Sequence, residues 1–371
     1  MLLDVIGAVI AQMDGNLPFV AFRKPGKQTV KVFLQENDAL HHVNDFTETG
    51  FVFAPFDEQE PSLLLKGDRI LSGIFGEVQN LHGDETGSFV QTDENRKAHI
   101  KLVNKGVQRI GDSELEKVVL SRRLRVPNTK TAIQLFRTLL HTYSGAYCYL
   151  WFHPEVGCWL GATPEILIRT ENKRFTTMSL AGTLPFIAGT LPKWGDKEKK
   201  EQRLVTEYIK NVLKDKAKAL RVSPAANFRA GALWHLRTKI EGQMQTDLKS
   251  FITALHPTPA VCGLPVSGAK TFILDNEYYP RSFYTGFLGE LNIKERLSRP
   301  AVAKRRNTEL KAYDGIRSRT ELFVNLRCMQ WHDDHMYIYV GGGITAASDA
   351  EKEWEETVHK SKTMLRVLLG K

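Results

Sequence analysis

The stretch from Met336 to Lys360 constrains the fold more than any other, because it places a strand, three glycines and an acidic helix in direct succession. Residues 336–340 are aromatic and β-branched, which is typical of a strand. Gly341–Gly343 carry no side chain, so their backbone can closely approach a ligand, and we interpret them as a turn. A helix is predicted after Ser348 and Asp349, which are good N-cap residues. The pattern therefore predicts a bare backbone segment beside a helix N-terminus.

The predicted C-terminal helix carries two carboxylates and an ammonium on one face. Glu353 and Glu356 are spaced i,i+3, and Lys360 follows Glu356 at i+4. Together with the glycines, these groups could bind a metal and an anionic ligand. They also suit an ordinary surface helix, because an acidic first turn complements the helix dipole and Glu–Lys pairs are common. The local pattern leaves both interpretations open.

A second acidic pair of the same spacing occurs far upstream. The helix predicted over residues 197–214 carries Glu198 and Glu201 near its first turn. Two such helices are what a single hard-cation site between them requires, and Mg²⁺ prefers a few carboxylates together with waters and substrate oxygens. Chance duplication is the alternative explanation, since glutamate is common early in helices.

The composition excludes several classes of protein. The chain has 371 residues, of which 42% are hydrophobic and 25% charged, as in a globular protein of one or two domains with a sizeable core. No apolar run approaches the roughly 20 residues of a membrane span, and no signal peptide is recognisable. The four cysteines form no metal or redox motif. We therefore expect a cytoplasmic protein that does not bind a membrane.

The net charge of +9 has a local origin. Residues 294–319 contain nine Lys and Arg but only three Asp and Glu, and they show no sustained periodicity. We predict an exposed basic loop there. Such a loop could touch nucleic acid, attract a small anionic substrate, or only improve solubility.

Lys117 and Glu165 each mark the beginning of a predicted apolar strand. We expect the strand Lys117–Leu120 to follow a helix that begins at Asp112. Lys117 could be an ordinary edge lysine, but burial would favour the neutral amine, which can act as a base. Glu165 follows a Thr-Pro turn. Ion pairing or exposure explains most such carboxylates, and a general acid with a raised pKa explains others.

His256 and Arg327 are further candidate binding residues. His256 lies in a rigid, proline-rich loop and could be a structural hydrogen-bonder or a substrate contact. Arg327 follows a predicted strand and could bind a carboxylate bidentately. Residues 1–110 contain no catalytic cluster, so we assign them to sheet and support and residues 111–371 to the catalytic region. The strands predicted in the first part include 19–22, 29–34 and 51–56.

Seven separated motifs, in order over roughly residues 112–369, resemble the chorismate-utilising enzymes. The motifs are Lys117–Arg122 (KVVLSR), Gly161–Glu165 (GATPE), Ser179–Thr183 (SLAGT), Leu255–Gly263 (LHPTPAVCG), Arg281–Gly286 (RSFYTG), Asn325–Arg327 and Gly341–Lys360. Within this family the pattern is most similar to the isochorismate synthases. The resemblance implies a single α+β domain of packed, mainly antiparallel sheets flanked by helices.

The resemblance also implies a role for each candidate residue. Lys117 would deprotonate the water that attacks C2 of chorismate, and Glu165 would protonate the departing C4 hydroxyl. Mg²⁺ would be held by Glu201 and Glu356, with Glu198 and Glu353 acting through water. The substrate contacts that it implies are Gly182, Thr183, His256, Ala260, Tyr284, Arg327, Gly341, Gly343 and Lys360.

Several residues distinguish this chain from other members of the family that it resembles. Anthranilate synthases typically have glutamine at the position of Lys117, and aminodeoxychorismate synthases have lysine at that of Ala181. Gln202 replaces the family's common histidine, and Gly342 its usual alanine. The activity implied is that of an isochorismate synthase serving menaquinone or siderophore biosynthesis. A salicylate synthase, which also eliminates pyruvate, and an anthranilate synthase component I-like enzyme are the alternatives.

The expected partners follow from the same resemblance. Chorismate is the expected substrate, and we expect a monomer or weak homodimer without a glutaminase subunit. A protein that binds nucleic acid through residues 294–319 is the alternative from a different class, and it would show salt-dependent binding.

Overall fold

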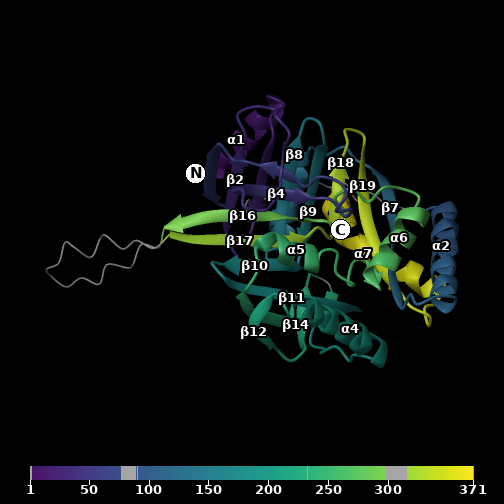
Figure 1. Ribbon diagram of the computed structural model, residues 1–371. Helices are drawn as coiled ribbons and strands as arrows, with labels where there is room; N and C mark the ends of the chain where they lie inside the picture. Colours follow the sequence, from purple (N-terminus) through teal and green to yellow (C-terminus); the bar gives the residue numbers. More distant parts are fainter. Residues whose placement is uncertain (1, 77–88, 90, 232, 297–315, 371) are drawn as a thin grey trace.

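Two large antiparallel sheets, packed face to face, form the centre of the computed structural model (Figure 1). The structure describes residues 2–76, 89, 91–231, 233–296 and 316–370. In strand order, the first sheet consists of β15 (Gly263–Leu264), β7 (Lys117–Pro127), β19 (His335–Ile344), β18 (Cys328–Trp331), β9 (Gly157–Thr163), β8 (Tyr147–His153), β1 (Phe19–Arg23), β2 (Thr29–Leu34) and β6 (Arg69–Ile74).

The second sheet has ten strands in the described residues. In order, they are β12 (Ala217–Val222), β14 (Leu233–Met244), β11 (Arg174–Pro185), β10 (Ile166–Glu171), β17 (Ile316–Val324), β16 (Phe287–Arg296), β4 (Gly50–Ala54), β5 (Leu63–Leu65) and β3 (His41–His42), while β13 (Ala226–Ala230) pairs with β14. The helices are α1 (Leu2–Asp14), α2 (Asp93–Gly111), α3 (Ala132–Thr142), α4 (Asp196–Leu213), α5 (Leu248–Leu255), α6 (Val266–Asn276) and α7 (Ala350–Leu369). The predicted fold class is confirmed.

Aromatic side chains fill the space between the two sheets. Tyr147 of β8 stacks on Phe323 of β17 with ring centroids 4.1 Å apart, and Phe22 of β1 lies 5.3 Å from Phe51 of β4. All four rings are fully or almost fully buried. Large flat side chains at alternate strand positions bury much apolar area per residue, so they hold the sheets together.

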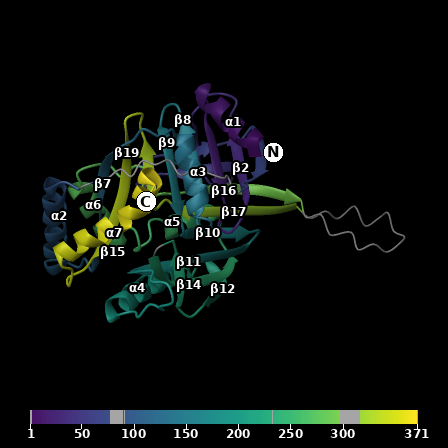
Figure 2. The same cartoon turned by 180° about the vertical axis from the view of Figure 1, so that it is seen from behind.

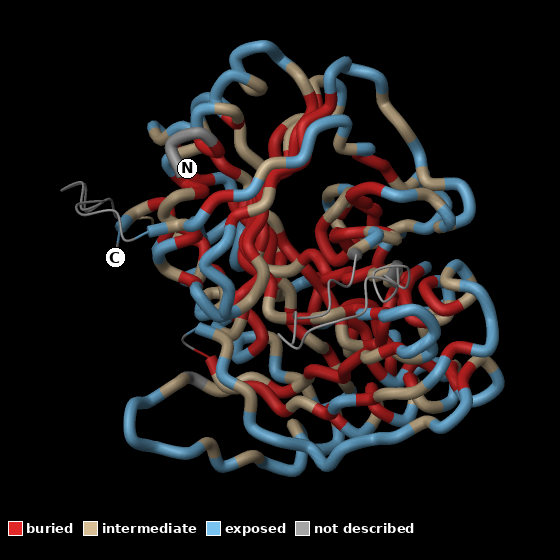
Figure 3. Tube along the Cα trace, turned by 90° about the vertical axis from the view of Figure 1, so that its left-hand side faces the viewer, coloured by how far each residue is buried: buried red, intermediate tan, exposed pale blue. Residues whose placement is uncertain are grey.

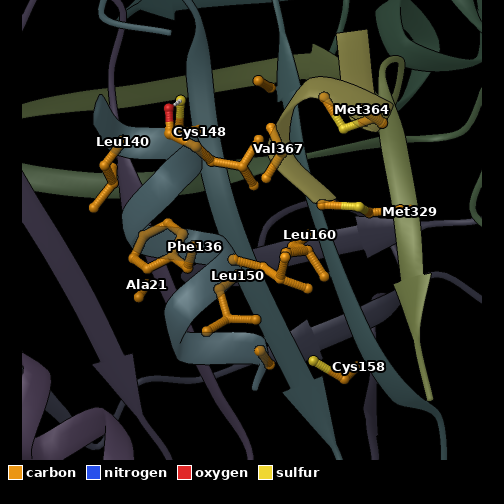
Figure 4. Packing of buried hydrophobic residues seen from close by; sticks show 14 of the residues in the cluster. Ala21, Phe136, Leu140, Cys148, Leu150, Cys158, Leu160, Met329, Met364 and Val367 are labelled. Atoms are coloured by element: carbon orange, nitrogen blue, oxygen red, sulfur yellow. Dashed lines mark hydrogen bonds between the residues drawn. The ribbon is translucent and has the colours of Figure 1, made fainter. Parts of the chain in front are cut away.

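The helices cover the outer faces of the sheets. Helices α1, α3 and α7 pack on the first sheet, where Phe136, Leu160 and Met364 belong to one cluster (Figure 4). Figure 2 shows α3 and α7 on that side from behind. Helices α4 and α5 cover the second sheet, and α2 and α6 pack near β7. The strands are therefore buried along the middle of the molecule, and exposure increases toward its periphery (Figure 3).

The predicted helix beginning at Asp112 is wrong. Asp112 is instead the C-cap of α2, which spans Asp93–Gly111. The N-terminal signal for this helix is Thr92, whose side chain accepts a hydrogen bond from the Asn95 backbone N–H. The segment between α2 and β7 is consequently a short connection that leads directly to Lys117.

The interpretation of Gly341–Gly343 as a turn is also wrong. The three glycines continue β19, and Gly343 pairs with Val119 of β7. Here glycine is needed for close packing: a Cβ on Gly341 would lie 3.0 Å from the Leu120 carbonyl oxygen. The segment without side chains that lies next to the carboxylates of α7 is therefore part of a strand and not a turn.

Most other predicted elements are confirmed, with small changes at their ends. The strands at 19–22 and 29–34 are β1 and β2, and the helix at 197–214 is α4. The ends of the predicted loop 294–319 are strand, since 294–296 continue β16 and 316–319 begin β17, while 297–315 lie outside the described residues. Among the described residues, no helix is both long and apolar enough to cross a membrane.

Candidate active site

One cavity collects most of the predicted site residues. It lies where β7, β11 and β19 meet α4 and α7. The predicted residues on its wall are Lys117, Glu165, Gly182, Thr183, Glu198, Glu201, Ala260, Tyr284, Arg327, Gly341, Gly343, Glu356 and Lys360. These positions come from distant parts of the sequence. The fold therefore brings together candidate residues that the sequence could predict only one at a time.

Lys117 is the first residue of β7 and is almost completely buried, with 2% of its surface exposed. Its Nζ lies 3.0 Å from Oε1 of Glu201 on α4. Pairing of β7 with both β15 and β19 fixes the strand from either side. A buried lysine on a rigid strand is thus held against one of the proposed metal ligands.

Glu165 lies between β9 and β10 and is also buried. Its backbone is fixed at both ends, because its N–H donates to Oγ1 of Thr163 and its carbonyl oxygen accepts from the Val324 N–H. Burial raises the pKa of Glu165 to about 8, although the charges of Arg327 and Lys117 act in the opposite direction. The carboxyl is therefore protonated at neutral pH and can donate a proton.

Arg327 supplies a cation to the same cavity. It has a positive φ of 49°, a conformation that is uncommon outside glycine. Its Nη1 atom is buried without a hydrogen-bond partner among the described residues. Desolvation lowers the pKa of Arg327, but an arginine remains charged under any ordinary condition. A buried guanidinium with a free donor suits an anionic ligand.

Of the four predicted cation ligands on α4 and α7, three are paired with lysines. Besides Glu201 with Lys117, Glu356 lies 2.6 Å from Lys360 Nζ, and Glu353 lies 3.1 Å from Lys197 Nζ. Burial alone would raise the pKa of Glu356, but Lys360 and the neighbouring cations outweigh it and lower the pKa. The Glu356 carboxylate is therefore ionised, as a cation ligand must be.

The carboxylates of α4 and α7 offer the oxygen donors that a hard cation prefers. In the part of the chain that the structure describes, no three acidic, histidine or cysteine groups lie close enough to hold an ion as they stand. Oε2 of Glu353, however, is buried and has no hydrogen-bond partner among the residues that the structure describes. A Cβ on Gly342 would lie 3.6 Å from this atom and 3.9 Å from Oε1 of Glu356, so the carboxylates of α7 converge on the bare strand. Carboxylate oxygens are ligands that Mg²⁺ prefers, so these donors fit the ion if Lys117, Lys197 and Lys360 move away from the glutamates that they contact.

The bulge of β11 forms another part of the wall. The pairing of β11 with β14 shifts between Ala181 and Leu184, and Gly182 has a positive φ of 70°. A Cβ at Gly182 would lie 3.1 Å from Cβ of Glu198, so glycine allows α4 to approach closely. Thr183 follows on the cavity wall.

His235 and Lys197 are cavity residues that the sequence analysis missed. Nδ1 of His235 lies 2.8 Å from the Gly182 carbonyl oxygen, which can only accept, so Nδ1 carries the proton. Burial lowers the pKa of His235 to about 3, so its buried Nε2 is an acceptor, and no described residue donates a hydrogen bond to it. Lys197 directly precedes Glu198, and this proximity was an available signal. His235 lies in an ordinary strand sequence and had no local signal.

Two predicted residues are not on the cavity wall. Nε2 of His256 donates to the Pro55 carbonyl oxygen at 3.3 Å, and its ring packs edge-on against Phe287. Burial lowers the pKa of His256 to about 4. Glu353 lies behind the wall, where Ser348 donates to it at 2.7 Å. Both positions favour a supporting role over direct substrate contact.

Comparison with known sequences defines the class of protein to which this site belongs. A family model described as a chorismate binding enzyme matches residues 71–305, more than half of the chain, and a second model of the same description matches residues 315–366. The chain belongs to the chorismate-binding enzymes.

Individual relatives agree with this family. The isochorismate synthase EntC of Escherichia coli is 29% identical over 268 residues, which cover 68% of this chain and 62% of that protein. DhbC, an isochorismate synthase of Bacillus subtilis, is 28% identical over 72% of this chain and 66% of its own length. The match thus spans less than two thirds of the relatives' length.

Solved structures show the same fold. The menaquinone-specific isochorismate synthase MenF from Escherichia coli superposes with a TM-score of 0.73 and 22% identity, covering 95% of this chain and 88% of that chain. Anthranilate synthase component I from Streptococcus pneumoniae gives a TM-score of 0.64 at 17% identity, with coverage of 95% and 91%. The shared architecture therefore extends to members with different reactions.

Proposed function

We propose that this chain is an isochorismate synthase, which converts chorismate to isochorismate with Mg²⁺. The observation that carries the proposal is the presence of a buried lysine, Lys117, and a buried, protonated carboxyl, Glu165, on the wall of one cavity. Water addition needs a base and departure of a hydroxyl needs an acid, and these two groups supply both. The names of the relatives support the same reaction.

The chain's own residues account for the proton transfers. Lys117, as a neutral amine, takes a proton from the water whose oxygen bonds to C2 of chorismate. Both ring double bonds shift in sequence around the ring, the bond from C4 to its hydroxyl breaks, and Glu165 donates its proton so that water departs. Lys117 must first separate from Glu201, because its Nζ is in contact with that carboxylate at 3.0 Å.

The remaining groups hold the substrate. Chorismate is a dianion, and Arg327 and Lys360 offer donors to its carboxylates from the cavity wall. We propose that Glu201 and Glu356 hold Mg²⁺ directly, with Glu198 and Glu353 supporting it through water. When bound, the cation would neutralise a carboxylate and withdraw electrons from the conjugated ring.

The product formed in isotopically labelled water tests the proposal. The purified protein is incubated with chorismate and Mg²⁺ in H₂¹⁸O, and the products are identified by mass spectrometry. We expect isochorismate that carries one ¹⁸O, and loss of turnover in excess EDTA or in the Lys117→Met variant. Turnover of chorismate without isochorismate, or full activity in EDTA, would contradict the proposal.

The same experiment separates the alternative reactions. Stoichiometric salicylate and pyruvate would identify a salicylate synthase, and anthranilate formed in the presence of ammonia would identify an anthranilate synthase component I-like enzyme. We favour an enzyme that stops at isochorismate. Whether pyruvate is also eliminated would depend on residues of the cavity wall such as Ala260, Val261 and Tyr284. By analogy with relatives named as menaquinone-specific and vibriobactin-specific isochorismate synthases, we place the reaction in menaquinone or siderophore biosynthesis. We propose a cytoplasmic location, which the four unbonded cysteines suit.

A further inference from the structure

A buried arginine connects the strand of Lys117 to the helix of the α7 carboxylates. Arg122 lies five residues after Lys117 on β7 and is only 8% exposed. Its Nε donates to Oγ1 of Thr357 at 2.7 Å, and its guanidinium carbon lies 4.0 Å from the centre of the Trp354 ring. Arg122 therefore makes a polar and a cation–π contact with one helix.

The two contacts flank the carboxylates on α7. Trp354 directly follows Glu353, and Thr357 directly follows Glu356. Thr357 in turn donates to the Trp354 carbonyl oxygen at 2.7 Å, which ties the two contact residues together. Because neighbouring positions on a helix differ by a fixed rotation, fixing residues 354 and 357 also fixes the direction of the carboxylates beside them.

The surroundings of Arg122 do not neutralise its charge. Its Nη2 is buried without a hydrogen-bond partner among the described residues. His99 of α2 lies beside Trp354, with ring centroids 5.9 Å apart, and burial lowers the pKa of His99 to about 3, so it is neutral. Burial lowers the pKa of Arg122 to about 10, which still leaves it charged at neutral pH. A buried charge without a paired carboxylate destabilises a fold, and a well-packed apolar side chain could replace it without loss of folding stability. Stability alone therefore does not explain an arginine at position 122.

We propose that Arg122 is a positioning residue, which keeps Glu353 and Glu356 of α7 turned toward Gly342 and the carboxylates of α4. It touches neither substrate nor cation. Helix α2 packs against both β7 and α7 and closes this end of the molecule (Figure 1). The inference rests on the proposed function, because it takes these carboxylates as the cation's ligands.

The direct test measures Mg²⁺ binding by isothermal titration calorimetry, beside kcat and the KM for chorismate. In the Arg122→Gln variant we expect the Kd for Mg²⁺ to rise by about tenfold or more, since loss of supporting contacts around metal ligands typically has effects of that size. Saturating Mg²⁺ should restore most of kcat. The matched control is Arg125→Gln on the same strand, whose exposed side chain pairs with Asp334 and should leave binding unchanged.

Two further variants distinguish the hydrogen bond of Arg122 from its charge, and one of them serves if Arg122→Gln does not fold. Arg122→Lys keeps the charge but loses the donor fork, so we expect an intermediate Kd. Thr357→Val removes the hydrogen-bond acceptor at constant shape, and it replaces Arg122→Gln if circular dichroism shows that variant to be unfolded. Wild-type Mg²⁺ affinity in the folded variant overturns the inference. Absence of Mg²⁺ binding in the wild-type protein removes the proposed cation site and the inference with it, whereas wild-type binding without isochorismate formation contradicts only the proposed reaction.

Discussion

At the scale of single residues, burial decides what Glu165 can do. Its carboxyl has an ordinary pKa of 4.5 and a pKa of about 8 in the folded protein, because desolvation penalises the charged form. A folded-state pKa that is raised means that the protonated group stabilises the fold fully below about pH 4.5. This contribution is lost as the pH rises through about 8.

Replacement of Glu165 by glutamine should separate its chemical from its structural effect. Glutamine keeps the shape but cannot donate a proton, so we expect turnover to fall roughly 10²–10⁴-fold while chorismate still binds. In the wild-type protein, kcat should decline above pH about 8. Urea unfolding between about pH 5 and about pH 9 should show a smaller loss of stability in the variant. A wild-type rate in Glu165→Gln would rule out its role as the acid.

The chemical types of the site residues could be predicted from the sequence, but their contacts could not. Lys117 and Glu165 stood out because charged groups rarely open apolar strands, and the fold places both on one cavity. That Lys117 pairs with Glu201 depends on packing between β7 and α4, which no local pattern encodes. His235 shows the same limit, since its place on the cavity wall and its contact with the bulge at Gly182 depend on the fold.

At the scale of elements, two neighbouring glycines of β19, Gly342 and Gly343, differ in how much space a side chain would have. A Cβ on Gly343 would lie 2.6 Å from Oε1 of Glu201 and 2.9 Å from Cε of Lys117. A Cβ on Gly342 would meet its nearest atom at 3.6 Å, which is ordinary contact. The two positions therefore form a matched pair for mutation.

We expect Gly343→Ala to displace Lys117 and Glu201 and to lower kcat at least tenfold, because small displacements of reacting groups are costly. The melting temperature should change little, since both displaced groups are ends of flexible side chains. Gly342→Ala should retain nearly the wild-type rate. Steady-state kinetics and thermal unfolding of both variants would check this, and equal activity of the two would show that the strand is not close to the reacting groups.

Element prediction from the sequence succeeded where periodicity was strong and failed at boundaries. The apolar stripe of α4 identified that helix to within a residue. Asp112 was assigned to the start of a helix, although Thr92 and the acidic residues after it begin α2. Three glycines suggested a turn, and only pairing with a strand more than 200 residues away makes them extended.

At the scale of the whole molecule, Lys24 connects the two sheets. It follows β1 in the first sheet and contacts Glu290 and Glu321, which face each other on β16 and β17 of the second. Burial would raise the pKa of both carboxyls, but Lys24 and nearby cations outweigh it and lower the pKa of each. A lowered pKa means that the stabilisation is present above about pH 4.5 and is lost as the pH falls.

The Lys24→Met variant should therefore be less stable by about 1.5–3 kcal/mol at neutral pH, because two buried carboxylates lose a shared cation while each keeps another cationic partner. Its deficit should shrink on acidification. Chemical denaturation at several pH values measures both effects. Lys239→Met, which breaks an exposed pair with Glu241, is the control and should cost at most about 1 kcal/mol. A similar loss in both variants would show that burial of the Lys24 cluster contributes nothing.

The pairing of β7 with β19 has a consequence for the synthesis of the protein. From Val118 to Pro127, β7 is paired with residues between His335 and Ile344, more than 200 residues further along the chain. All the residues between the two strands must therefore be synthesised before the strand that carries Lys117 gains this neighbour. Contacts between such distant segments also slow folding. The wall of the cavity is thus completed only after β19 and α7 have been synthesised.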